Sequence, residues 1–224
     1  MQQKVKLTKR QIKEDKFTIF MLKSRGWFQD NWQFVTIGLV VVILLSVAVV
    51  YYAQSRVTSD EEAAAKFAEA VAYYRRGNTQ EASMRLQTIV SEHSSSSLAD
   101  EATYLLGNLN LRSRNYSEAT RYYEIYLKET KGFPMTRAAA AAGIAVAYEN
   151  QSMFTEAADY YLKAIKAYPD GPLDGDYSLA LMRCYLETEQ ENLAREQLDH
   201  VTKSYQGTEL ANRAIRIFQE KYPG

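Results

Sequence analysis

The stretch NYSEATRYYEIYL at residues 115–127 returns, altered but recognisable, as MFTEAADYYLKAI at residues 153–165. Two weaker copies flank this pair, NTQEASMRLQTIV at 78–90 and QENLAREQLDHVT at 190–202. Similarity at a nearly fixed spacing is typical of chains that stack small units of one structure. The repeat therefore predicts an array of similar units instead of one or two ordinary globular domains.

The repeated unit has the spacing of a helix pair. One small residue occupies the same column in all four copies: Ala82, Ala119, Ala157 and Ala194. A large apolar residue follows it by four positions: Leu86, Tyr123, Tyr161 and Leu198. Positions i and i+4 share a helix face, so the small residue marks where a neighbouring helix approaches and the large one fills the adjacent space. An earlier helix carries its own small residue: Ala70, Gly107 or Ala145.

Short turns separate the two helices of each unit. The sequences RGN (76–78), SRN (113–115) and NQS (150–152) supply residues that tolerate left-handed backbone. A single helix pair would leave an apolar face in water, so the units must stack. This register places Ala63 in a solvated first turn. The expected fold class is all-α.

The two central copies resemble the tetratricopeptide repeat (TPR) superfamily. The third copy matches its pattern at Tyr148, Phe154, Ala157, Tyr161, Ala164 and Pro169. The second matches at Leu106, Gly107, Tyr116, Ala119 and Tyr123. The chain departs from the pattern at Asn110, Met182 and Glu189. The resemblance implies an α-solenoid of about four helical hairpins, at 63–99, 100–137, 138–174 and 175–206, followed by a C-terminal cap helix at 207–224.

An apolar segment at residues 34–53, FVTIGLVVVILLSVAVVYYA, has the length of a membrane span. Twenty helical residues extend about 30 Å, which is the thickness of the hydrocarbon core of a bilayer. Aromatic residues suited to the headgroup level flank it: Trp27, Phe28 and Trp32 before, Tyr51 and Tyr52 at its end. A cleaved signal peptide is disfavoured because the segment begins late and ends in tyrosines. We therefore predict a single N-terminal transmembrane helix.

Charges on the two sides of this segment predict its orientation. Residues 1–33 hold eight Lys/Arg against three Asp/Glu, whereas acidic residues soon follow the segment: Asp60, Glu61 and Glu62. Positive flanks remain in the cytoplasm. We expect a basic cytoplasmic segment at 1–33 that contains a short helix, a linker at 54–62, and an external body. In a bacterium this is a single-pass protein of the inner membrane with a periplasmic C-terminal domain.

Composition and motifs argue against nucleic-acid binding and catalysis. Of the 27 basic and 27 acidic residues, 19 basic and 24 acidic ones lie after residue 33. The body therefore lacks the basic surface that is typical of nucleic-acid-binding proteins. Hydrolase, zinc and phosphate-loop motifs are missing from the sequence. His93 and His200 lie far apart, and Cys184 is expected as a buried apolar residue. We expect no enzyme activity, no cofactor, no metal site and no nucleic-acid partner.

The resemblance to TPR proteins also implies an inner groove lined by the first helix of each pair. The inward positions expected here are Phe67, Val71, Tyr74, Arg75, Tyr104, Asn108, Leu111, Arg112 and Arg183. An apolar floor with a few arginines suits an extended or helical protein segment with exposed apolar side chains. The alternative is that these aromatic residues only pack the interior of the superhelix.

The layout of a basic head, one span and external repeats resembles the ancillary subunit of the bacterial Sec translocon. That resemblance implies an adaptor that recruits chaperones or client proteins near the export machinery. Its partners would be translocon subunits, periplasmic chaperones or client chains, with membrane lipid around residues 34–53. The alternative is an envelope-assembly or cell-division-linked scaffold of the outer-membrane assembly or Tol-Pal type. The repeats resemble those of such proteins because their period of 37 or 38 residues is longer than the usual period of about 34. The oligomeric state stays open.

Overall fold

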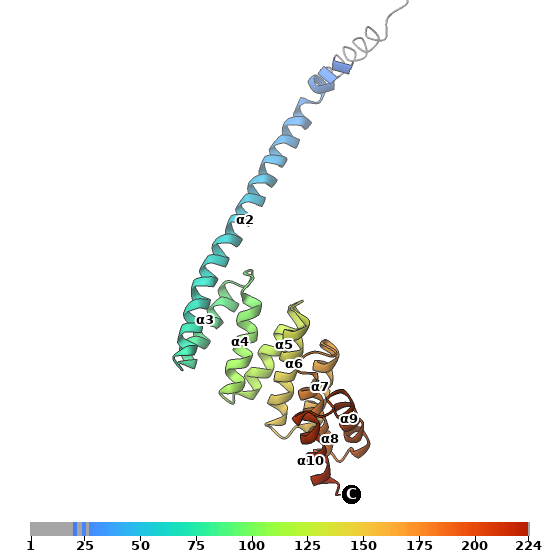
Figure 1. Cartoon of the computed structure of the whole chain (residues 1–224). Helices are drawn as coiled ribbons and strands as arrows, with labels where there is room; N and C mark the ends of the chain where they lie inside the picture. The colour runs from blue at the N-terminus through green and yellow to red at the C-terminus, as the bar shows by residue number, and fades with distance from the viewer. Residues whose placement is uncertain (1–19, 22–23, 26, 224) are drawn as a thin grey trace, which may run out of the picture. The chain divides into compact units, whose positions relative to one another are not determined.

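The computed structural model describes residues 20–21, 24–25 and 27–223, and every regular element in this part of the chain is a helix (Figure 1). The helices are α2 (Trp32–Arg75), α3 (Thr79–Glu92), α4 (Ala99–Arg112), α5 (Tyr116–Glu129), α6 (Pro134–Glu149), α7 (Phe154–Ala167), α8 (Asp174–Glu187), α9 (Glu191–Ser204) and α10 (Glu209–Lys221). The all-α prediction is confirmed for this part of the chain. Most of the short helix expected within residues 1–33 lies outside the described residues.

The chain divides into two compact units, residues 1–55 and 56–224. The first unit contains the apolar part of α2, where an 18-residue window has a mean hydropathy of 2.8 and no buried residue. Aromatic side chains at both ends of this part are exposed, among them Trp32 and Tyr51. Within the described residues, α2 is the one helix long and apolar enough to cross a membrane. A signal sequence near the N-terminus would have the same properties.

The interval 54–62, expected as a linker, is helical and lies inside α2. Nothing between Trp32 and Arg75 breaks a helix, because this stretch has no proline and its alanine-rich second half favours helix. Asp60 accepts hydrogen bonds from Ser96 Oγ at 2.7 Å and from the Ser97 amide at 2.9 Å. These contacts make the end of the expected linker a part of the repeat body.

The alanine columns are buried as the repeat spacing predicts. Ala82, Ala119, Ala157 and Ala194 have no exposed surface, and the earlier helices bury Ala70, Gly107 and Ala145. The expectation for Ala63 is wrong, because this residue is also fully buried, in a cluster with Ala82 and Leu86. The body therefore begins about one turn earlier than the expected register, and α2 supplies the first helix of the first pair.

The turn between the helices of each pair contains one residue with left-handed backbone. These residues are Gly77 (φ 79°), Arg114 (φ 61°), Ser152 (φ 60°) and Glu189 (φ 58°). The first three lie within the turn sequences that were predicted to tolerate this conformation. The fourth is the position where the TPR pattern usually has a glycine, so the turn geometry is retained although the glycine is not.

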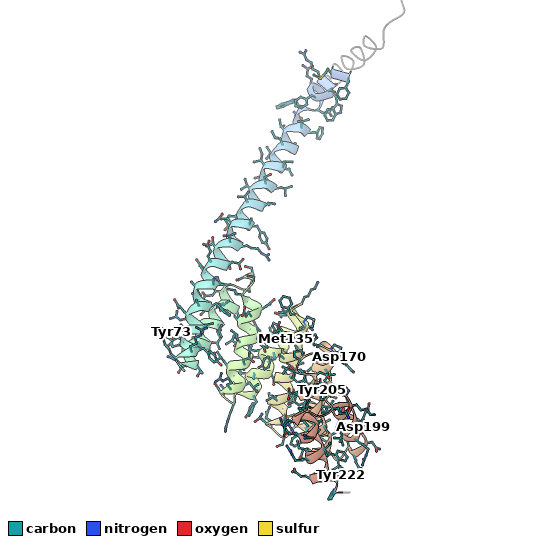
Figure 2. The ribbon with its side chains drawn as sticks, viewed as in Figure 1. Tyr73, Met135, Asp170, Asp199, Tyr205 and Tyr222 are labelled. Carbon is teal, nitrogen blue, oxygen red and sulfur yellow. The ribbon has the colours of Figure 1, made fainter. Side chains whose placement is uncertain are left out.

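The cap helix α10 closes the body at its C-terminal end, where Figure 2 labels Tyr222. Thr208 caps its first turn by accepting a hydrogen bond from the Ala211 amide, and its buried face consists of Ala211, Ala214 and Phe218. This face packs against α8 and α9. Arg195 of α9 lies over the ring of Phe218, 5.0 Å from its centroid.

Candidate protein-binding pocket

A pocket of about 300 Å³ lies between α2 and α4, the first helices of the first two pairs. We call it the α2–α4 pocket. Its lining consists of Ala70, Val71, Tyr74, Leu86, Leu105, Asn108, Leu109, Leu111 and Arg112. Six of these side chains are aliphatic, and Leu86 reaches the pocket from α3, the helix behind. The pocket is therefore an apolar hollow at the low end of the size range for small-molecule and side-chain sites.

The polar groups of the α2–α4 pocket come from three side chains. Arg112 donates a hydrogen bond to the hydroxyl of Tyr74, and its guanidinium lies 5.1 Å from the centroid of that ring. Tyr74 is 38% exposed and Arg112 is exposed, so this pair stands where the pocket meets solvent. A tyrosine face and a guanidinium attract each other through the ring quadrupole. The contact links the C-terminal ends of α2 and α4.

The third polar side chain is that of Asn108, and a hydrogen bond to a buried core residue holds it in place. Its Oδ1 accepts a hydrogen bond from the hydroxyl of Tyr123 at 2.8 Å. Tyr123 is 1% exposed, and burial together with the neighbouring Tyr104 raises the pKa of its hydroxyl well above the usual value. The hydroxyl therefore stays protonated and donates, which leaves the amide nitrogen of Asn108 to donate toward the pocket.

Five of the nine residues expected in the groove line the α2–α4 pocket: Val71, Tyr74, Asn108, Leu111 and Arg112. Of the others, Phe67 packs against the core cluster beside the pocket, and Arg75 is exposed at the end of α2. The ring of Tyr104 packs at a tilt against those of Tyr123 and Tyr126, with centroids 5.9 and 5.5 Å away. Interior packing is thus the role that the structure shows for Tyr104.

The ninth residue, Arg183, lies in a different pocket of about 310 Å³ beside α10. Its guanidinium donates to Glu149 Oε1 at 2.6 Å, and Glu149 Oε2 accepts from the Tyr161 hydroxyl at 2.7 Å. Burial, and then the bond to Glu149, raise the pKa of Tyr161 far above its usual value. The charge of Arg183 is therefore compensated by Glu149 within the body. Arg183 does not lie with the arginines at the ends of α2 and α4.

Four wall residues of the α2–α4 pocket were not expected as site residues: Ala70, Leu86, Leu105 and Leu109. The repeat pattern does single out Ala70 and Leu86, but as packing positions. A pocket forms beside them because a small residue on α2 and leucines from two other helices leave space unfilled. The sequence contains these residues, but no pattern in it predicts the unfilled space between them.

The histidines and the cysteine that the sequence offers for catalytic or metal-binding chemistry belong to three different helices: His93 ends α3, Cys184 lies in α8 and His200 lies in α9. His93 is buried at the end of α3, 3.4 Å from the hydroxyl of Ser59, and His200 contacts Asp174 Oδ2 at 3.1 Å. Cys184 is fully buried, and burial raises the pKa of its thiol to about 12. Over residues 20–21, 24–25 and 27–223, no group of three or more His, Cys, Asp or Glu side chains could hold a metal ion.

Stacked helical hairpins with a partly apolar hollow define a helical-repeat scaffold. A family model, described as a tetratricopeptide repeat-like domain, matches residues 25–158. The chain belongs to this family. Domains of this kind generally bind other proteins and act as scaffolds rather than as enzymes.

Solved structures with the same arrangement of helices support the fold. A tetratricopeptide repeat protein from Parabacteroides merdae shares 13% sequence identity and has a TM-score of 0.63, over 72% of this chain and 60% of that chain. A putative kinesin light chain repeat protein from Podosopora anserina shares 17% identity with a TM-score of 0.56, over 70% of this chain and 84% of that one. Comparison with curated proteins gives no match. At these identities the likeness concerns the fold alone.

Proposed function

We propose that this protein is a membrane-tethered adaptor that uses its repeat body to recruit chaperones or client proteins near the protein-export machinery. The proposal places residues 1–33 in the cytoplasm, anchors the chain through residues 34–53, and exposes the body on the periplasmic side of a bacterial inner membrane. Its main support is the α2–α4 pocket, because an apolar hollow on a scaffold of this family is suited to a protein side chain.

The apolar part of α2 supports a retained anchor over a cleaved signal sequence. It ends in Tyr51 and Tyr52 rather than in the small residues of a cleavage site, and the helix continues unbroken to Arg75. The family match at residues 25–158 includes this segment together with the first repeats. A run of exposed Val, Leu and Ile side chains on one helix is unfavourable in water, whereas it matches the interior of a bilayer.

The layout of basic head, span and repeats supports the link to protein export, through its resemblance to the ancillary subunit of the Sec translocon. An adaptor in that position would meet chains that emerge from the membrane with apolar side chains still exposed. Such chains suit an apolar pocket, since burial of an exposed side chain is favourable by about 1.5–3 kcal/mol. The alternative is a scaffold for outer-membrane assembly or cell division, and it makes the same use of the repeats with other partners.

Photo-crosslinking in intact cells tests the proposal. Benzoylphenylalanine replaces Tyr74, an aromatic residue at the edge of the α2–α4 pocket, in the full-length protein. The matched control carries it at Lys128, which is exposed on α5. We expect adducts with translocon subunits or periplasmic chaperones from position 74 and not from position 128. Reporters fused after Gly224 and before Met1 should be active only outside and only inside the cytoplasm, respectively.

Any other result of the crosslinking or of the reporter fusions contradicts a specific part of the proposal. Adducts with outer-membrane assembly or division proteins would replace it with the scaffold alternative. Equal adducts from both positions would contradict a role for the pocket. A reversed reporter pattern would overturn the topology, and with it the periplasmic location.

A further inference from the structure

We infer that the α2–α4 pocket selects a protein segment in which a bulky apolar side chain is followed within a residue or two by carboxylates. This inference rests on the proposed function and names the chemistry of the segment that the pocket takes. It combines three observations: the apolar walls, a group of arginines at one end of the pocket, and the acidic residues that end the first helices of the later pairs.

The walls set the first requirement. Val71, Leu105 and Leu109 come from both sides of the α2–α4 pocket, and Leu86 contributes from behind. A volume of about 300 Å³ accommodates one large side chain but not a folded element. Transfer of such a side chain from water into this hollow is the favourable step, so the anchor must be aromatic or a large aliphatic residue.

Arginines at the helix ends set the second requirement. Arg75 and Arg76 lie at the C-terminal end of α2, and Arg112 and Arg114 lie at that of α4. The contact between Tyr74 and Arg112 shows that these two ends lie side by side. Within the part of the chain that the structure describes, none of the four arginines forms an ion pair with a carboxylate.

Five arginines elsewhere in the described part of the body do have carboxylate partners, whereas Arg137 and Arg213 do not. Arg85 pairs with Glu69 at 3.3 Å and Arg183 with Glu149 at 2.6 Å. The group near the pocket is therefore a local positive end on a body that is acidic as a whole, with 24 Asp/Glu and 19 Lys/Arg after the first 33 residues. Charge complementarity favours an acidic partner for such a site.

The helix dipole accounts for a single basic residue at a helix end, which α5, α7, α9 and α10 also have, but not for four arginines at two adjacent ends. Basic residues at the C-terminal end of a helix are stabilising in general. The first helices of the later pairs, however, end in Glu149 (α6) and Glu187 (α8) and have no basic residue in the last turn. Among the first helices of the four pairs, only the two that form the pocket therefore end in arginines.

Arg112 fixes the distance between anchor and charge. Because Arg112 itself lines the pocket, a carboxylate that pairs with it must follow the buried side chain closely along the bound segment. A guanidinium binds a carboxylate through two parallel hydrogen bonds, which gives this position geometric selectivity as well as attraction.

Peptide binding to the full-length protein in detergent tests the inference. Three fluorescent peptides share Gly-Ser spacers and differ in their centre: Phe-Glu-Asp, Phe-Lys-Lys and Ser-Glu-Asp. Fluorescence anisotropy should show that the first binds at least about tenfold more tightly than either of the others, because it alone satisfies both requirements. Added salt should reduce the preference over the Phe-Lys-Lys peptide but not the preference over the Ser-Glu-Asp peptide, since salt screens exposed charges and not apolar contacts.

Charge reversal supplies the matched controls. Arg112→Glu should weaken binding of the Phe-Glu-Asp peptide about tenfold and improve binding of the Phe-Lys-Lys peptide. Arg213→Glu makes the same charge change at an exposed position of α10 and should leave both affinities within about twofold. Circular dichroism of each variant confirms that the body is folded.

The outcomes separate this inference from the proposed function. The inference fails if the Phe-Lys-Lys peptide binds as tightly as the Phe-Glu-Asp peptide, or if Arg213→Glu changes the affinities as much as Arg112→Glu does. Either result would mean that the pocket does not select for acidic residues. Crosslinks from position 74 to export proteins would then still uphold the adaptor role. If none of the three peptides binds to the folded protein, the segment chemistry is wrong, whatever the crosslinks show.

Discussion

A Cβ atom on Gly107 would lie 2.6 Å from ring carbon Cδ1 of Tyr123. The same ring faces Gly143 on its other side, where a Cβ atom would come within 2.5 Å. Tyr123 of α5 is thus enclosed by a glycine of α4 and a glycine of α6, and it is 1% exposed. Both first helices can approach the second helix between them only because neither position carries a side chain.

We expect Gly107→Ala to destabilise the body, although alanine favours helix over glycine by about 1 kcal/mol. The enclosed ring cannot rotate away, so overpacking of about 1–3 kcal/mol outweighs most or all of that gain and leaves a net loss of up to about 2 kcal/mol. Thermal unfolding of the full-length protein, followed by circular dichroism, measures the change.

A double variant tests the cause of this loss. With Tyr123→Leu already present, Gly107→Ala has no ring to displace and should be neutral or stabilising. Equal losses in both backgrounds would show that the glycine matters for another reason.

Alanines of the repeat columns provide a second prediction about packing. Ala119→Leu and Ala63→Leu should each cost about 1–3 kcal/mol, because both residues have no exposed surface. Ala65→Leu, at an exposed position of the same helix as Ala63, should change the stability by no more than about 0.5 kcal/mol. Similar melting temperatures for the Ala63 and Ala65 variants would contradict the burial of Ala63.

The comparison between Ala63 and Ala119 shows what the sequence could predict. The column that contains Ala119 repeats four times, so its burial follows from periodicity. Ala63 lies at the very start of the first copy, and its burial depends on Ala82 and Leu86 of the next helix. A period identifies contacts within the array, but it does not determine where the array begins.

The candidate site could also be predicted only in part, because the repeat spacing gives the helix face on which a residue lies but not the neighbour that its side chain contacts. Helical spacing places Val71 and Arg112 on inward faces, and both line the α2–α4 pocket. Tyr104 shares that spacing, yet its ring turns toward Tyr123 and Tyr126, because a rotamer and not the register decides which neighbour it meets. Arg183 is neutralised by a glutamate one repeat away, a pairing that only the folded chain creates.

The turn before α9 offers a stabilising substitution. Glu189 has a φ of 58°, and left-handed backbone costs a non-glycine residue about 1–2 kcal/mol. Glycine loses about 0.4–1 kcal/mol more conformational entropy on folding. Glu189→Gly should therefore stabilise the body by about 0.5–1 kcal/mol, measured as a higher melting temperature.

Two controls accompany Glu189→Gly. Gly77→Ala, at the equivalent turn with φ 79° and open space around it, should destabilise the body through backbone strain alone. Glu187→Gly places glycine at the helical end of α8 and should lower the stability. A destabilised Glu189→Gly variant would mean that the glutamate side chain contributes more than its backbone strain costs.

The junction between α2 and the turn before α4 should make stability depend on pH. The hydrogen bond from Ser96, followed by the one from the Ser97 amide, lowers the pKa of Asp60 below its ordinary value of 3.8. A carboxyl with a lowered pKa in the folded state stabilises that state above the pKa of the unfolded chain. This stabilisation is lost as the pH falls through the folded-state pKa of Asp60.

We therefore expect Asp60→Asn to lower the melting temperature at neutral pH, with a difference from the wild type that shrinks as the pH is taken below 3.8. Ser96→Ala should lower the melting temperature at neutral pH as well, because it removes the 2.7 Å bond to the carboxylate. Ser94→Ala, exposed in the same turn, is the matched control and should melt like the wild type. If the Asp60→Asn difference persists unchanged in acid, the charge of Asp60 does not stabilise the junction, and the geometry of its hydrogen bonds to Ser96 and Ser97 must account for the loss instead.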